Sequence, residues 1–290
     1  MTTVAEQVQT ESRLRFRYAV IAFAAAILIV VSQLLQLSGA QPPVSEATVT
    51  LITENSRATI DIIGAALDML GLLSLAYLLF WLHRSAQARQ PTLRDVTRWT
   101  ATAGAVLAAV MALVYTILFT QKAHQFVTTG DQSYPEASHL FSSALWFIPQ
   151  LVLELGNLLL AVGVVLVALS AMRVGLITRV IGYAGVLSGA LFIIGVPLLT
   201  PVVQGFWLAA TAVLLARRWP SGDPPAWDSG EAVPWPPTAR QQAQQDRARD
   251  RATRGQRRGR VTDKDVLAAV ERREPPPNPR AGRAKRKRRK

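Results

Sequence analysis

The sequence predicts an all-α fold: a polytopic bundle of about six transmembrane helices, followed by a basic C-terminal tail that is largely disordered. Three observations lead to this prediction. Apolar residues are gathered into six runs of about 20, the helix length that crosses about 30 Å of hydrocarbon. Lys and Arg are absent from the interiors of these runs. Of the 32 Lys and Arg residues, 21 lie after residue 216, so the tail carries +12 of the net charge of +13.

The chain divides into five segments where its composition changes. Residues 1–17 form a short N-terminal segment, and residues 18–216 form the six-span domain. Residues 217–260 are a linker, first rich in Pro and then polar and basic. Its Pro-rich part, residues 219–237, is expected to be extended and solvated, and residues 238–260 have no apolar face with which to pack. Residues 261–273 are expected to form a short amphipathic helix, and residues 274–290 form a polybasic tail.

Each apolar run is expected to be a helix, because backbone polar groups in hydrocarbon must be satisfied within the segment. The predicted spans are Tyr18–Leu37, Ile60–Leu82, Trp99–Phe119, Leu145–Leu169, Val180–Pro197 and Val202–Ala216. The sixth is the shortest and therefore the weakest as a full crossing. Basic residues precede the first span and small residues follow it, as in a cleavable signal peptide. Its length of about 20 residues favours an uncleaved anchor, and cleavage within residues 1–40 remains the alternative.

Basic residues alternate between the segments that connect the spans. From the N-terminal segment to the fifth loop they number three, one, four, one, two and none, and many follow in the tail. This alternation agrees with the positive-inside rule at every crossing. We therefore predict a multi-pass protein of the plasma membrane, surrounded by the lipid bilayer, with both termini in the cytoplasm.

Carboxylates lie inside two of the predicted spans. Asp68 in the second span and Glu154 in the fourth both lie about 12–15 Å below the outer surface, at about 1.5 Å per residue. Asp61 is one heptad before Asp68 on the same face, and Gln150, Glu154 and Asn157 form one stripe. Gln33, Gln36, Tyr115 and Gln204 add polar groups in the same outer half. The candidate polar pocket therefore comprises Asp61, Asp68, Gln150, Glu154 and Asn157.

Two interpretations of the intramembrane carboxylates remain open. A charged group at mid-bilayer costs about 2.5–3.5 kcal/mol on insertion scales, so such residues usually face the interior of the bundle or water. At least one of the two is expected to be neutral at pH 7. In the first interpretation they line an outward-facing pocket that binds a cation, a proton or a small polar solute. In the second they form hydrogen bonds between helices, with no transport.

The sequence lacks the residue patterns of the common membrane enzymes. It has no Cys and only three His, and neither H-E-x-x-H nor G-x-x-x-x-G-K-[ST] occurs. His124 and His139 lie in one predicted outer loop, but their separation is not a metal-ligand signature. These absences favour a non-enzymatic protein with no catalytic residue, cofactor or metal site, and an enzyme that acts at the outer leaflet remains an alternative.

The tail ends in a polybasic run whose members are Arg283, Lys285, Arg286, Lys287, Arg288, Arg289 and Lys290. Each basic residue near an anionic leaflet gains about 1 kcal/mol, so we expect this run to contact anionic lipid headgroups. A salt-dependent contact with nucleic acid, including a ribosome, is a second possibility, and a purely solubilising role is a third. The helix predicted at residues 261–273 is marginal alone and could fold on a protein partner.

The sequence Gly-Leu-Ile-Thr-Arg-Val-Ile-Gly-Tyr-Ala-Gly-Val-Leu-Ser-Gly at residues 175–189, with Trp207 and the Leu-Leu-Ala-Arg-Arg of residues 214–218, resembles the last two spans of a group of bacterial membrane proteins. These are uncharacterised six-span proteins that carry a domain of unknown function. The resemblance covers residues 15–218 and rests on hydropathy and a few glycines. It implies an all-helical fold in a bacterial inner membrane, and it transfers no functional residue.

Overall fold

The computed structural model describes residues 4–38, 46–142, 144–195, 199–220 and 222–234. Within these ranges the chain forms helices and no strand, which confirms the all-α class. The helices are α1 (Val4–Leu37), α2 (Ala47–Arg89), α3 (Asp95–Thr128), α4 (Tyr134–Ser142), α5 (Ala144–Arg173), α6 (Arg179–Ile194), α7 (Leu199–Leu215) and α8 (Ala226–Ser229). The predicted helix at residues 261–273 and the polybasic run from Arg283 to Lys290 lie outside the described residues.

Four helices, α1, α2, α3 and α5, are long and apolar enough to cross a membrane. They correspond to the first four predicted spans. The fifth and sixth predicted spans correspond to α6 and α7, which are apolar but contain only 16 and 17 residues. At about 1.5 Å per residue these helices are about 24–26 Å long, which is shorter than the hydrocarbon layer of about 30 Å. The six-span prediction is therefore supported by helix length for four spans.

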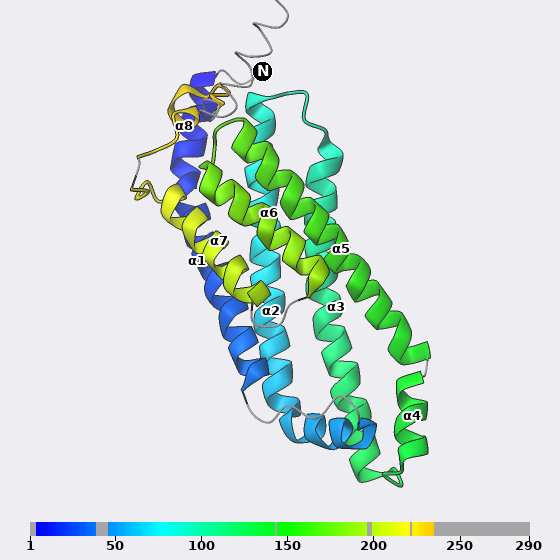
Figure 1. The fold of residues 1–290 in the computed structure, drawn as a ribbon. Helices are drawn as coiled ribbons and strands as arrows, with labels where there is room; N and C mark the ends of the chain where they lie inside the picture. Colours follow the sequence, from blue (N-terminus) through cyan, green and yellow to red (C-terminus); the bar gives the residue numbers. More distant parts are fainter. Residues whose placement is uncertain (1–3, 39–45, 143, 196–198, 221, 235–290) are drawn as a thin grey trace, which may run out of the picture. The chain divides into compact units, whose positions relative to one another are not determined.

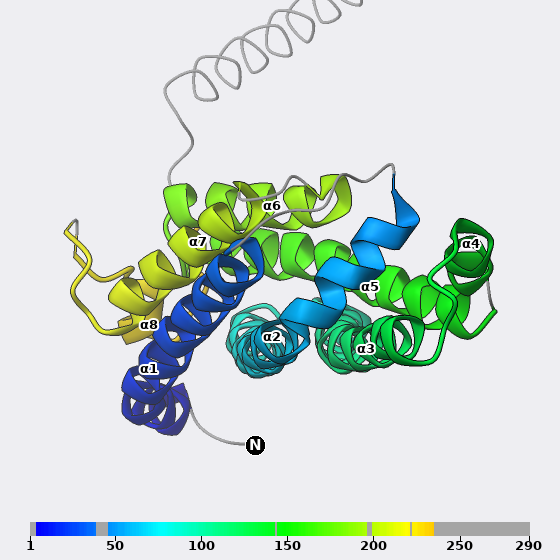
Figure 2. The ribbon, with the colours of Figure 1, turned by 90° about the horizontal axis from the view of Figure 1, so that it is seen from below.

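Six of the helices form a closed ring in which each packs on the next, in the order α1, α2, α3, α5, α6, α7 and back to α1. Figure 1 shows the ring from the side, and Figure 2 shows it from below. We call the end where α1 begins the near end, and the end where α3 finishes and α4 lies the far end. The first part of α2 lies across the far end before the helix turns to run along the bundle. The α6–α7 hairpin covers only the part of the bundle closer to the near end (Figure 1).

The crossing of α3 and α5 is close because glycines lie at the contact. A Cβ on Gly104 of α3, or on Gly163 of α5, would collide with backbone atoms of the other helix. A Cβ on Gly156 would lie 2.7 Å from the backbone nitrogen of Ala108. Small residues at such positions let two helix backbones approach within the membrane. This contact fixes the position of Asn157, the residue after Gly156, relative to α3.

The chain after α7 folds back onto the near end through residues 222–234, which we call the near-end strap. Trp227 in α8 is only 2% exposed, and its Nε1 donates a hydrogen bond to the carbonyl of Leu176, 2.9 Å away. The backbone nitrogen of Val233 donates to the carbonyl of Val174 at 3.1 Å. The expectation that residues 219–237 are extended and solvated is therefore wrong for residues 222–234. A buried indole outweighs the Pro-rich composition because it removes a large apolar surface from water.

Trp227 lies among aromatic and charged side chains of α1 and α2. Its ring stacks on Trp81, with centroids 5.5 Å apart and an interplanar angle of 14°. The guanidinium groups of Arg15 and Arg89 lie 4.7 and 5.1 Å from the centroid of the Trp227 ring. Such cation–π contacts are stronger where the cation is shielded from water. Arg15 on α1 and Arg89 on α2 thus hold the strap against the first two helices.

Both arginines are also ion-paired. Arg89 donates to the two carboxylate oxygens of Glu11 at 2.7 and 3.0 Å, and its Nε donates to the carbonyl of Ala226 at 2.9 Å. Arg15 donates to the two oxygens of Asp223 at 3.1 and 3.2 Å. Buried charges require such partners. Glu11 and Arg15 belong to the predicted N-terminal segment 1–17, which is continuous with the first span in α1 from Val4 onward.

Candidate functional site: a polar pocket inside the helix ring

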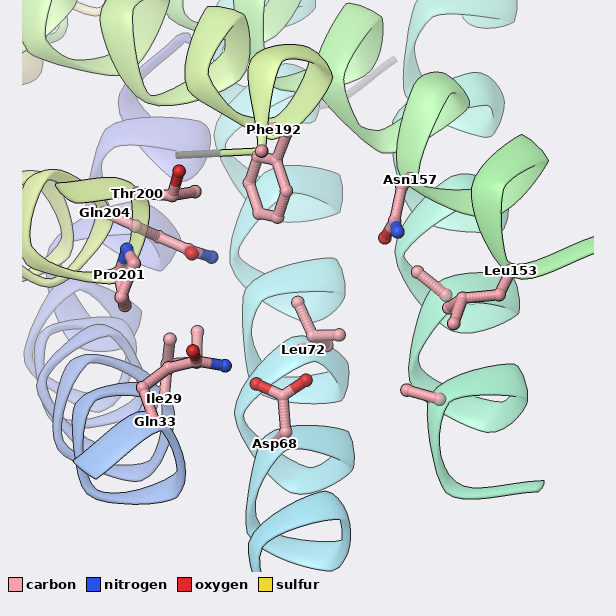
Figure 3. Close-up of a pocket in the computed structure, with 13 residues that line it drawn as sticks. Ile29, Gln33, Asp68, Leu72, Leu153, Asn157, Phe192, Thr200, Pro201 and Gln204 are labelled. Atoms are coloured by element: carbon pink, nitrogen blue, oxygen red, sulfur yellow. The ribbon is translucent and has the colours of Figure 1, made fainter. Parts of the chain in front are cut away.

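A pocket of about 310 Å³ lies inside the ring, at the tip of the α6–α7 hairpin. All six ring helices contribute to its lining (Figure 3). Its polar lining residues are Gln33, Asp68, Asn157, Thr200 and Gln204, and its larger apolar lining residues are Ile29, Leu72, Leu153, Phe192 and Pro201. The site therefore combines a few converging polar groups with an apolar wall, as small-molecule sites usually do.

The shape of the hairpin tip brings its side chains into the pocket. Gly195 ends α6 in the left-handed conformation, with φ 64°, which glycine adopts without a steric penalty. The hydroxyl of Thr200, in the first turn of α7, donates to the carbonyl of Leu191 at 3.3 Å and ties the two helices together. Phe192 on α6 and Gln204 on α7 then approach the same space (Figure 3).

Asp68 is the only charged residue among the described lining residues. It is half-buried, and its carboxylate points into the space that the amide of Gln33 also faces (Figure 3). Within the described part of the chain, no hydrogen bond or ion pair joins Asp68, Gln33 or Asn157 to another residue. All three side chains are only partly buried, so their polar groups can bind water or a solute in the cavity.

Gln204 is a fourth polar side chain of the pocket that lacks a partner, and it is more deeply buried than the other three. It is 3% exposed, and its Nε2 is buried without a hydrogen-bond partner among the described residues. Its amide points into the pocket (Figure 3). Leaving a buried donor unsatisfied costs about 1–3 kcal/mol. A cavity of this size has room for water or for a solute that accepts this hydrogen bond.

The pocket does not continue toward the near end. Leu75 and Leu79 follow Asp68 on α2 and are fully buried, as is Trp207 on α7. They belong to one apolar cluster that also includes Trp81 and Trp227. Among the described residues, this packed layer lies between the pocket and the near end.

Asp61, predicted to share a pocket with Asp68, lies in a separate pocket of about 270 Å³ nearer the far end. There its Oδ1 pairs with the NH2 of Arg57 at 3.5 Å. The same NH2 donates to the carbonyl of Gln36 at 2.7 Å, so Arg57 also caps the end of α1. Glu54 lines this pocket as well. The i,i+4 spacing of Arg57 and Asp61 was visible in the sequence and could have indicated the pair.

Gln150 and Glu154 are exposed on α5 and line neither pocket, although Asn157 on the same predicted stripe lines the pocket with Asp68. The hairpin explains the difference. α6 packs on α5, but it ends before it reaches the far-end part of that helix (Figure 1). Of the five predicted residues, Asp68 and Asn157 are therefore brought together, whereas Thr200 and Phe192 join them without having been singled out from the sequence.

Within the described ranges, no group of three His, Asp or Glu side chains is arranged to hold a metal ion. Searches with protein-family models, against curated proteins and against solved structures found no match to this chain.

Proposed function

We propose that this protein is a solute-binding membrane protein, most simply a carrier, whose site is the pocket around Asp68. The observation that supports this most is the set of polar groups of that pocket. Asp68, Gln33, Asn157 and the Nε2 of Gln204 line one cavity and have no partner among the described residues, beside a cluster of buried apolar side chains. Polar groups with no other use in such an interior mark a binding site.

The alternative, interhelical hydrogen bonding by neutral acids, fits the geometry less well. It requires the carboxyl of Asp68 to bond a side chain or a carbonyl of a neighbouring helix, and the described residues provide no such bond. It also requires Glu154 to face another helix, whereas Glu154 is exposed. Solute binding explains both the unpaired carboxyl and the cavity beside it.

The distribution of charge supports an orientation in which the near end is cytoplasmic. The helix ends and connections at the near end carry Arg13, Arg15, Arg17, Arg84, Arg89, Arg94, Arg98, Arg173, Arg179, Arg217 and Arg218. The far end carries Arg57 and Lys122. Under the positive-inside rule the far end is then external. The packed layer beyond Leu75 closes the pocket on the cytoplasmic side, so we propose an outward-facing state.

The test is labelling of the purified protein, reconstituted in lipid, with a hydrophobic carbodiimide, which attacks protonated carboxyls in apolar surroundings. Labelled peptides are quantified from pH 9 to pH 5. We expect Asp68 to react and its labelling to increase as the pH falls, because only the protonated carboxyl reacts. Asp95, which is 59% exposed in its side chain, serves as the aqueous control and should not react. No labelling of Asp68 at any pH would contradict a solute-accessible pocket.

A second candidate function belongs to the tail, and the charge of residues 217–290 favours it. We propose that the polybasic run from Arg283 to Lys290 contacts anionic lipid at the cytoplasmic leaflet, at about 1 kcal/mol per basic residue. Nanodisc-embedded full-length protein should bind vesicles that contain phosphatidylserine, and a variant lacking residues 280–290 should not. Equal binding of the two proteins, or preferential binding of the full chain to RNA, would contradict the lipid assignment.

A further inference from the structure

We propose that the ligand of the Asp68 pocket is a small organic cation that also carries a hydrogen-bond acceptor, of the amino-alcohol class. This inference rests on the proposed function, because it assigns a substrate class to the same pocket. It follows from three properties of the pocket: the sign of its charge, the kind of hydrogen bond it leaves unmade, and its volume.

The charge of the lining selects a cation. Asp68 is the single charged group, and neither Lys, Arg nor His is found among the described lining residues. An anion would meet an unpaired carboxylate with no counter-charge, whereas an ammonium group would neutralise it. Phe192 adds an aromatic ring to the wall, which favours a cation over a neutral group of the same shape.

Comparison with the other pockets supports this assignment. Asp61 lines the pocket nearer the far end, and Glu11 lines a pocket of about 510 Å³ between α1 and α2 at the near end. Both carboxylates are already paired with arginines, Asp61 with Arg57 and Glu11 with Arg89. Asp68 is different, since no cation of the described chain neutralises it. A ligand cation is the partner that the site lacks.

The unmade hydrogen bond selects an acceptor. The Nε2 of Gln204 is a donor, it is buried, and it points into the cavity. A ligand with a hydroxyl, ether or carbonyl oxygen would satisfy it, and a purely alkyl cation would not. Gln33 and Asn157 have amide oxygens that can accept from an ammonium or a hydroxyl. Two different groups of one ligand are thus recognised, the cation at Asp68 and the oxygen at Gln204.

The volume sets the size. A cavity of about 310 Å³ corresponds to about ten water molecules at about 30 Å³ each. A cation of six to ten heavy atoms therefore fits within it. Choline is a suitable probe because it combines a compact cation with one hydroxyl.

The experiment is calorimetric titration of the full-length protein in nanodiscs with three probes of matched shape. Choline has both features, 3,3-dimethylbutan-1-ol has the hydroxyl but no charge, and propyltrimethylammonium has the charge but no hydroxyl. We expect choline to bind at least tenfold more tightly than the neutral alcohol and several-fold more tightly than the alkyl cation. Choline should also protect Asp68 from the carbodiimide.

Variants separate the two contacts. Asp68→Asn should abolish choline binding, and Gln204→Met should remove the preference for choline over propyltrimethylammonium while retaining a weak response to both cations. Glu154→Gln, on the exposed face of α5, is the matched control and should bind like the unmodified protein. Thermal unfolding of each variant verifies that it is folded, and the three-probe comparison on the unmodified protein decides the question if a variant is not.

The outcomes distinguish the inference from the proposed function. If Asp68 reacts with carbodiimide but neither cation binds or protects it, the pocket is accessible and the cation assignment is wrong. Equal affinity for choline and the neutral alcohol would also overturn it. If Asp68 never reacts and no probe binds, the proposed function itself fails. Equal affinity for the two cations would refute the acceptor at Gln204.

Discussion

Replacing Glu11 by Gln would leave the guanidinium of Arg89 buried without its counter-charge. The two side chains are 9% and 0% exposed, and they are joined by hydrogen bonds of 2.7 and 3.0 Å. Removing one partner of a buried pair typically costs about 3–5 kcal/mol. Arg89 would retain its hydrogen bonds to the carbonyls of Ser85 and Ala226, both 2.9 Å long. We therefore expect the lower end of this range, about 3 kcal/mol in the free energy of unfolding.

The assay is a double-mutant cycle in which unfolding of the protein in mixed micelles is followed by tryptophan fluorescence. The variants are Glu11→Gln, Arg89→Met and their combination. If the cost comes from an uncompensated charge, the double variant should be less destabilised than the sum of the single ones, by about 2 kcal/mol. Glu46→Gln, at the exposed residue that precedes α2 and makes no side-chain cap hydrogen bond, is the control. A loss below about 1 kcal/mol for Glu11→Gln, with no coupling, would refute the reasoning.

Three further substitutions test the packing. Trp227→Ala should lower the free energy of unfolding by about 3–5 kcal/mol because its indole is buried, whereas Trp99→Ala, at a side chain that is 57% exposed, should change it much less. Gly163→Val should lower the free energy of unfolding by about 1–3 kcal/mol because α3 occupies the space of a Cβ. Ala103→Val, on the exposed face of α3, should lower it by less than about 0.5 kcal/mol. Equal losses for the two variants would contradict the close crossing of α3 and α5. Gly175→Ala should release the strap, because φ is 78° at this glycine and a backbone carbonyl of the strap lies against it. Trypsin should then cleave the chain between α7 and α8 faster than in the unmodified protein. An unchanged cleavage rate would argue against this contact.

The long helices could be predicted from the sequence because hydropathy is a local signal. A run of apolar residues such as 60–82 predicts a buried or membrane-spanning helix whatever that helix packs against. The lengths of α6 and α7 were harder to predict, since the glycines and prolines between residues 189 and 201 are compatible with either two full crossings or a shorter hairpin. The near-end strap could not be found from composition. Its one decisive residue, Trp227, lies in a segment whose prolines are typical of an extended chain.

The candidate site was predicted in part for the same reason. Asp68 stood out because a carboxylate in an apolar run is costly by itself. Asn157 followed from helical periodicity, but periodicity also selected Gln150 and Glu154, which lie on the part of α5 that α6 does not cover. Whether a polar residue faces a pocket or the exterior depends on where its neighbour ends. This depends on tertiary packing, so it cannot be predicted from the pattern of polar residues on one helix.

The near-end strap can form its contacts only late in synthesis of the chain. Arg15 is synthesised early, and its partner Asp223 follows it by 208 residues. At about 5–20 residues per second, about 10–40 s separate the two during translation. Throughout that interval the charge of Arg15 must be accommodated by water, headgroups or a chaperone. The contact that satisfies it forms only after the six helices of the ring have been made. The strap can therefore close only after those helices have been made, so its closure requires that the chain of the ring is complete.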